Sequence, residues 1–493
     1  MRSPKPASPL VHRRHICCLL AVLGIGGCAA PAWQPAERPE TAPATQPSAS
    51  LSLDATQIKP MYRELLAIDL PTVVRVAAAR NLDIEQARQR VEASRGRYEA
   101  SVEMIVPIVA PSLLYQHLEG VNQSANGVPV AANFDNFLPA VSVQWILNPG
   151  RVVSDIVASK RRMEASEQQQ ESVVLETTRL AASQYYDLAL TQARLGVARQ
   201  AVAEAEELVR ITSVRVRAGT GLPADDLRAA AALAARQQDL AVALYNFYQA
   251  SVALTLTLHL DPVVTLVPEA EQISQTTLVR DDMPVEELLV TALRCRPDLE
   301  AVRTLVRAAR ADTSSTAWGG LGPQAQAGYS YGGLATNTTE GNFSLHEQQK
   351  ASAGVGLALD ASTFGRLKTA GANERLAALD VERQIDQVRA AVVSAQQASI
   401  TNARLVPVAA QQLQSAEEAL RLAQANLQAG TMLTLDVLQA QRAVDDARLR
   451  YADAVVHYNQ SQVNLLAAVG ALDERHLFAA AKPITMPAGG GGR

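Results

Sequence analysis

The sequence predicts a mainly α-helical fold with transmembrane-type β-strands, built as a tandem repeat of helix, β-hairpin, long helix and helix. Three observations support this. The stretch from Val152 to about Arg217 has one glycine and no proline, and it is rich in strong helix formers. Pairs of segments with period-two alternation have the pattern of strands. The same series of elements occurs twice along the 493 residues.

The composition favours long, closely packed helices. Hydrophobic residues make up 48% of the chain but aromatic residues only 4%, so alanine and aliphatic residues supply the apolar share. The net charge of −4 gives no reason to expect nucleic-acid binding. Three of the four cysteines lie within the first 28 residues and the fourth is Cys295, so no intrachain disulfide framework is expected.

The first 66 residues are predicted to be a leader and a tether. Residues 1–27 combine basic residues with a short apolar run, Ile16 to Ile25, which is typical of a signal peptide. The run ends in Ile-Gly-Gly-Cys28, which resembles a bacterial lipobox and implies an acylated Cys28 as the first mature residue. An ordinary secretory leader with a chance cysteine is the alternative. Residues 28–66 are rich in Pro and Ala and predict an extended tether.

The residue after the cysteine indicates in which membrane the lipid anchor is expected. Ala29 is not the aspartate that such lipoproteins use for retention in the inner membrane, so the outer membrane of a Gram-negative-type bacterium is favoured. More than one acyl chain would make the anchoring stable.

The repeat rests on three pairs of positions in the same order. They are Asp83 with Asp298 and Arg151 with Arg366, each 215 residues apart, and Asp225 with Asp436, 211 residues apart. The first structural repeat is therefore predicted over 67–280 and the second over 281–472, followed by a flexible C-terminal tail, 473–493.

Each repeat is expected to begin with one helix of about 35 residues, over 70–105 and 285–318. A β-hairpin follows, at about 110–147 and about 324–360. In the first hairpin Val141, Val143, Trp145 and Leu147 alternate with the residues between them, as strand residues with one apolar face do. Loops rich in Asn, Gly, Ser and Thr are predicted at about 121–135 and 333–350, which leaves strands of about 10 to 12 residues.

Long helices are predicted after the hairpins, over 152–217 and 367–428. At ~1.5 Å per residue each is on the order of 100 Å long. Pro407 is expected to bend the second one. Both end at Ala-Gly-Thr, a glycine C-cap signal, in tips predicted at 218–226 and 429–436. Helices over 225–260 and 436–469 then return alongside.

Four strands cannot close a membrane barrel, because bacterial barrels have at least about eight strands. An open sheet in lipid would leave unpaired edges, which lipid does not tolerate. We therefore expect several copies of the chain to share one barrel, continued by the helices as a hollow α-helical barrel.

The tandem halves, the paired hairpins, Gly-Arg after each hairpin and the motif Ala-Gly-Thr-x4-Asp-Val-Leu at 429–438 resemble the TolC family of outer-membrane efflux proteins. The lipobox resembles that of its acylated members. The resemblance covers about residues 67–472. It implies a homotrimer with a 12-stranded β-barrel continuous with a periplasmic α-helical barrel. It also implies a periplasmic adaptor protein and an inner-membrane pump, either an RND-type or an ABC transporter.

The resemblance also implies roles for the two tips. The adaptor-docking residues would be Gly219, Thr220, Asp225, Gly430 and Thr431. Asp436 matches the aspartate that faces the pore constriction, whereas Leu427, Met432 and Gln439 replace a tyrosine, an arginine and a second aspartate. We therefore expect a mixed gate of Leu427, Asp436 and Gln439 with weaker cation selectivity. Simple helix capping is the alternative reading for Asp225 and Asp436.

No catalytic chemistry is indicated. The sequence shows no nucleophile–base pair, and its histidines lack metal-ligand spacing. We expect no enzyme, no metal and no cofactor apart from the covalent lipid on Cys28. The implied role is a passive outer-membrane exit duct for small molecules, drugs or metals. A channel for type I protein secretion and a pore-free coiled-coil envelope scaffold are the alternatives. The sequence does not name the exported compound, the pump class or the resting state of the gate.

Overall fold

The computed structural model describes residues 65–124, 126–269, 274–280, 282–337, 343–357 and 360–472, all within one compact unit. The predicted leader, Cys28, almost all of the tether and the tail 473–493 lie outside them. The helices are α1 (Leu70–Arg80), α2 (Leu82–Glu103), α3 (Pro149–Arg217), α4 (Pro223–Thr257), α5 (Val285–Cys295), α6 (Pro297–Leu321), α7 (Ser362–Gln428) and α8 (Thr434–Val469). The strands are β1 (Leu65–Ile68), β2 (Ile108–Gln123), β3 (Pro129–Leu147), β4 (Thr265–Pro268), β5 (Pro323–Asn337) and β6 (Phe343–Leu357). The predicted mainly helical fold, with a hairpin in each half, is confirmed.

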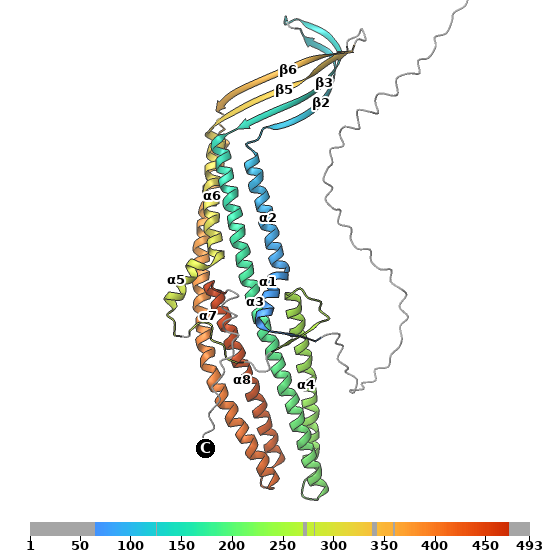
Figure 1. The fold of residues 1–493 in the computed structure, drawn as a ribbon, viewed down its shortest axis with the longest axis vertical. Helices are drawn as coiled ribbons and strands as arrows, with labels where there is room; N and C mark the ends of the chain where they lie inside the picture. Colours follow the sequence, from blue (N-terminus) through green and yellow to red (C-terminus); the bar gives the residue numbers. More distant parts are fainter. Residues whose placement is uncertain are drawn as a thin grey trace, which may run out of the picture. The chain divides into compact units, whose positions relative to one another are not determined.

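The two long helices organise the fold. α3 has 69 residues and α7 has 67, and α7 runs through Pro407 as one helix. α3 packs against α2 and α4, and α7 packs against α6 and α8, as Figure 1 shows. α3 also packs against α6 and α8, which joins the two repeats. Each long helix therefore lies beside two shorter ones.

The first helix of each repeat is broken, contrary to the single helix that the sequence predicted. The breaks fall at equivalent positions, Asn81 and Arg296, whose backbones are extended. Pro297 explains the second break, because the residue before proline avoids the helical region. No proline follows Asn81. Its side chain instead caps α2 by accepting a hydrogen bond from Asp83 N at 2.8 Å, and it donates to Thr257 O at 2.9 Å.

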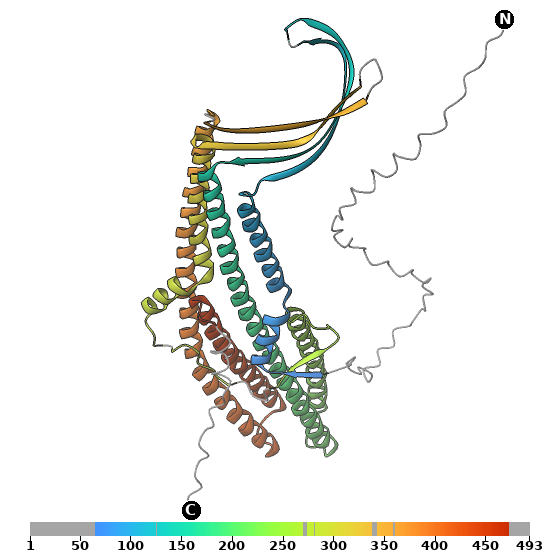
Figure 2. The ribbon, with the colours of Figure 1, turned by 45° about the horizontal axis from the view of Figure 1, so that its top comes forward.

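The hairpins join into one antiparallel sheet with the strand order β2-β3-β5-β6. Its strands have 16, 19, 15 and 15 residues, so they are longer than predicted and much of each predicted loop is strand. Figure 2 shows that these strands curve strongly along their length. A short parallel pair, β1 with β4, was not predicted, and β1 begins at Leu65 inside the span assigned to the tether.

Two glycines allow the helices to approach each other closely below the sheet. A Cβ at Gly150 of α3 would lie 2.0 Å from the ring of Trp318 on α6, and a Cβ at Gly320 of α6 would lie 2.2 Å from the side chain of Thr363 on α7. No side chain fits at either contact. By contrast Gly365, the equivalent of Gly150 in the second repeat, faces open space.

The segment that links the two repeats is held by α8. The Oδ1 atom of Asn459 accepts a hydrogen bond from Thr276 N at 2.8 Å. The Oε1 atom of Gln462, which is fully buried, accepts from Leu278 N at 3.0 Å and from Val279 N at 2.7 Å. These amides satisfy backbone groups of a segment that belongs to no helix or strand. Residues 276–279 are therefore fixed against α8, and Val279 is part of the core.

Candidate functional site at the helical tips

The two tip turns have the same geometry. Gly219 and Gly430 adopt left-handed backbone conformations, with φ of 74° and 78°. In each turn the glycine N–H and the next N–H close a Schellman motif, which satisfies the last carbonyls of the long helix. The hydrogen bonds are Gly219 N to Val216 O (3.1 Å), Thr220 N to Arg215 O (3.0 Å), Gly430 N to Leu427 O (3.0 Å) and Thr431 N to Asn426 O (3.0 Å).

Asp225 and Asp436 both lie in the first turn of the returning helices. Asp436 Oδ2 accepts a long hydrogen bond of 3.4 Å from Leu433 N, which caps α8. Asp225 Oδ1 accepts from Arg228 Nη1 at 3.0 Å. Carboxylates at a helix N-terminus also interact favourably with the helix dipole. Both aspartates thus have a structural role, and a gating role for Asp436 stays a prediction.

The structure does not bring the predicted gate residues to one surface. Leu427 is 2% exposed and packs in a core that α3, α4, α7 and α8 share, so its side chain points away from solvent within one chain. Met432 packs partly against the same core. Asp436 is half-buried and Gln439 is exposed. Within one chain, solvent therefore reaches Gln439 and, in part, Asp436 and Met432, but not Leu427.

Sequence reasoning missed two features of the tips. Arg215 near the end of α3 donates from Nη1 to Leu427 O at 3.0 Å, so the two tips are joined directly. Leu222 and Leu433, which precede α4 and α8 at equivalent positions of the two repeats, are 64% and 66% exposed. The 211-residue offset between Asp225 and Asp436 pairs these leucines, and this signal could have found them.

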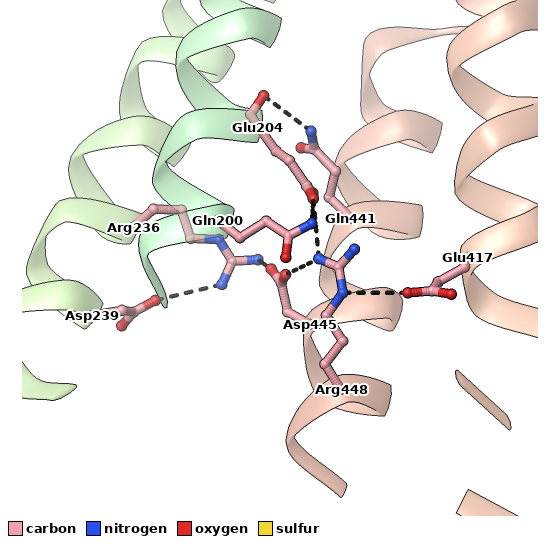
Figure 3. Close-up of polar contacts among 8 residues, drawn as sticks. All are labelled: Gln200, Glu204, Arg236, Asp239, Glu417, Gln441, Asp445 and Arg448. Carbon is pink, nitrogen blue, oxygen red and sulfur yellow. Dashed lines mark hydrogen bonds and ion pairs between the residues drawn. The ribbon is translucent and has the colours of Figure 1, made fainter. Parts of the chain in front are cut away.

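A buried ion network connects the four helices behind the tips (Figure 3). Arg236 of α4 contacts Asp445 of α8 at 2.6 Å, between Nη2 and Oδ2. Arg448 of α8 contacts Glu204 of α3 at 3.0 Å and Glu417 of α7 at 3.6 Å. The α3/α4 hairpin and the α7/α8 hairpin are thus tied together by charge as well as by apolar packing.

The large sheet has two chemically different faces. Residues directly opposite each other in a ladder share a face, so the register of the strands assigns each side chain to one face. One face carries apolar rows such as Val109, Val143 and Tyr329, with Pro111, Val141 and Tyr331 in the next row. The other face carries rows such as Ser142, Ser330 and Lys350. Lys350 of β6 lies on this face, whereas Glu347 of the same strand lies on the first face.

The remaining sequence candidates fall outside these features. Cys295 is an exposed thiol at the end of α5. Among the residues that the structure describes, no three His, Cys, Asp or Glu side chains gather as a metal ion would require. α4 is long and apolar enough to span a membrane by length and composition, and only 22% of its most apolar window is buried. It nevertheless packs along α3.

Comparison with solved structures finds the same fold. The outer-membrane channel OprN is 20% identical, with a TM-score of 0.69 over 88% of this chain and 98% of its own. The CmeC outer-membrane channel of Campylobacter jejuni is 16% identical, with a TM-score of 0.71 over 83% of this chain and 88% of its own. The open state of the Neisseria gonorrhoeae MtrE channel is 19% identical, with a TM-score of 0.65 over 81% and 88%. No curated protein matches in sequence.

The family assignment comes from the sequence itself. The family model described as outer membrane efflux protein matches residues 73–258 and 288–471, one match in each repeat. Together the two matches cover most of the chain and contain both long helices, both tips and the sheet. The chain belongs to the outer membrane efflux protein family.

Proposed function

We propose that three copies of this chain form a continuous duct through the outer membrane and the periplasm, which serves as the passive exit of a tripartite efflux system for small molecules. The observation that supports this most directly is the two-faced sheet. Its outer strands, β2 and β6, each have one neighbouring strand in the described part of the chain. Pairing β6 of one copy with β2 of the next would remove both edges, and three copies would give twelve strands.

The apolar face has the height of a membrane. Its rows run along β3 from Leu147 to Phe137, where Tyr115, Ala335 and Leu345 share the last apolar row. Within this band β6 contributes two polar side chains, Gln349 opposite Tyr331 and Glu347 opposite Gly333. Ten residues at ~3.4 Å per residue span about 34 Å along the strand. At a tilt of about 40° the band would be about 26 Å tall, which matches the ~25 Å apolar band of outer-membrane barrels. Beyond it, His117 and Asp135 make a polar row.

The tips would supply the docking surface for a periplasmic adaptor. Gly219, Thr220 and Asp225 of one tip, and Gly430 and Thr431 of the other, shape two equivalent turns. Each turn presents an exposed leucine, Leu222 or Leu433, and a second exposed leucine, Leu227 or Leu435, follows in the first turns of the next helix. Apolar side chains exposed among polar ones are suited to protein contacts. The inner-membrane pump, RND-type or ABC, would supply the energy, while the duct itself would carry out no chemistry.

An acylated Cys28 would anchor each copy to the outer membrane next to the barrel. This proposal rests on the Ile-Gly-Gly-Cys sequence that precedes a tether of about 40 residues. Cys28→Ser is expected to abolish incorporation of a radiolabelled fatty acid, and unchanged incorporation would exclude this residue as the lipid site.

The duct is tested with the purified full-length chain in detergent and in planar bilayers. A trimeric mass and discrete single-channel currents are expected. A monomer without currents would contradict the duct and favour the alternative of a pore-free envelope scaffold. Two neighbouring substitutions test the sheet: Val141→Lys would place a charge on the apolar face, at a cost of about 2–4 kcal/mol, and should impair membrane assembly. Ser142→Lys, on the opposite face, should assemble normally. Equal behaviour of the two variants would refute the assignment of the faces.

A further inference from the structure

An open groove of about 650 Å³ lies between α6 and α7, at the end of α7 that follows the sheet. α6 forms one edge of the groove, and one face of α7 forms most of its lining. The residues of this α7 face are Gly365, Arg366, Thr369, Ala370 and Asn373, of which all but the half-buried Ala370 are exposed.

The corresponding face of α3 is covered. Each groove residue of α7 has a counterpart 215 positions earlier, at the offset that relates the two repeats. Those counterparts contact α6 within the same chain: Ser154 Oγ donates to Ser314 Oγ at 3.1 Å, and Asp155 accepts a hydrogen bond from Ser315. The same face of the long helix is therefore occupied in the first repeat and open in the second.

The helix of the first repeat that corresponds to α6 is α2, and its matching face is open as well. The counterparts of the α6 residues that contact α3 include Glu99, Ala100 and Glu103, and all three are exposed. α2 packs on α3, α3 on α6 and α6 on α7, so α2 and α7 lie at opposite ends of this row (Figure 1). Each chain thus contains one completed contact of this kind and the two separated halves of another.

We propose that the face of α2 formed by Glu99, Ala100 and Glu103 docks into the α6/α7 groove of a second copy, in the way that α6 docks onto α3 within one chain. The inference rests on the proposed assembly of several copies, and it names the residues that join neighbouring copies next to the sheet. Such a contact is heterologous, because it joins two different surfaces. Repeated by a rotation that closes, it produces a ring.

The polar pair at the centre of the completed contact is replaced as a unit. Asp155 and Ser315, which are hydrogen-bonded to each other, correspond to Ala370 and Ala100. Loss of only one partner would leave a covered polar group unpaired, whereas the loss of both is nearly neutral. The two alanines therefore suit each other across an interface, although their helices do not meet within one chain.

One ion pair of the completed contact has no counterpart. Arg162 of α3 pairs with Asp312 of α6. The corresponding residues are Ala377 and Arg97, which cannot form such a pair.

A different ion pair is available in the docked arrangement. Glu103 takes the place of Trp318, and Arg366 takes the place of Arg151. The side chain of Arg151 lies against the residue that follows Trp318. Arg366, which is 56% exposed, would therefore reach the carboxylate of Glu103 in the second copy. A flexible glutamate in place of the tryptophan ring also leaves room for a Cβ at Gly365.

Paired cysteines test the docking in the full-length chain with Cys295→Ser, which removes the exposed thiol. With Ala100→Cys and Ala370→Cys in one chain, oxidation should link the copies into a ring and give a reducible species of three times the chain mass. The matched control combines Ala100→Cys with Ala372→Cys, which lies about 200° around the helix from Ala370. Its counterpart, Val157, is 42% exposed beside α6, so the control should stay unlinked.

A second pair and an internal standard keep the test decisive. Glu99→Cys with Thr369→Cys, the counterparts of Ser314 and Ser154, should give the same ring. Ser154→Cys with Ser314→Cys should form its disulfide within one chain and leave the mass unchanged, which shows that oxidation proceeds at this spacing.

The mass in detergent, measured before oxidation, separates this inference from the proposed duct. A trimer in which neither pair links the copies, while the internal standard closes, would overturn the docking and leave the duct in place. Equal linking through Ala370→Cys and Ala372→Cys would also overturn the docking. A monomer would contradict the duct and the docking together.

Discussion

Replacement of Arg448 by methionine tests whether the ion network holds the two hairpins together. Arg448 is the cation that α3, α7 and α8 share, and its side chain is 17% exposed. Methionine fills much of the same volume without charge. Arg448→Met would leave Glu204, which is 19% exposed, without its 3.0 Å ion pair.

The magnitude can be worked from these contacts. Loss of one partner of a buried ion pair costs about 3–5 kcal/mol, because the other charge stays buried. The partial exposure of Arg448 and Glu204 favours the lower end of that range. The contact with Glu417 adds little, since Glu417 is 51% exposed. We therefore expect a loss of about 3 kcal/mol in the free energy of unfolding per chain.

Thermal unfolding in detergent, followed by circular dichroism at a fixed scan rate and neutral pH, measures this loss. With about 400 ordered residues the unfolding entropy is about 0.8 kcal/mol per degree, so the melting temperature should fall by about 3–4 °C. The matched control is Arg442→Met, an exposed arginine on the same helix, which should melt within about 1 °C of the wild type because surface substitutions cost little. A melting temperature for Arg448→Met equal to that of Arg442→Met would refute a stabilising role of the network.

Three further predictions concern the helix contacts and the pore. Gly150→Ala should destabilise by about 1–3 kcal/mol through overlap with Trp318, whereas Gly365→Ala should be neutral or stabilising; melting curves compare the two, and equal effects would contradict the close approach of α3 to α6. Asp436→Ala should change single-channel conductance or ion selectivity if this carboxylate lines the constriction, and unchanged currents would leave it as a helix cap. Lys350→Gln should shift ion selectivity toward cations at 10 mM salt, where charges act over about 30 Å, and an unaltered reversal potential would exclude Lys350 from the lumen.

The repeat could be predicted from sequence because its signals are local and occur twice. The uninterrupted helix-forming stretch of α3 and the Ala-Gly-Thr ends of both long helices needed no tertiary information. The break at Asn81 could not be predicted, because no proline follows it and its cap depends on a bond to Thr257, 176 residues away. The strands were predicted too short because polar and glycine residues weaken alternation, while the ladder hydrogen bonds that extend them are independent of side chains.

The candidate site, like the fold, contains some features that could be predicted from the sequence and others that could not. The glycine turns at Gly219 and Gly430 were evident from sequence because only glycine readily adopts their backbone conformation. The orientation of Leu427 was not evident from sequence, because a leucine near a helix end can face a pore or a core with the same periodicity. The ion network could not be predicted from the sequence at all. Its members come from four helices up to 244 residues apart, and none stands out on its own helix.

The hydrogen bonds that hold the link between the repeats have a consequence for biosynthesis. The hydrogen-bond acceptor of Thr276 N is Asn459, 183 residues later, so this bond forms only after α8, the last helix of the described residues, has been synthesised. Before that point the backbone N–H groups of Thr276, Leu278 and Val279 lack their acceptors on α8. Contacts between residues so far apart in the sequence form slowly. We therefore expect a nascent chain of this protein to depend on holding factors until α8 has been synthesised, although each half contains the same series of elements.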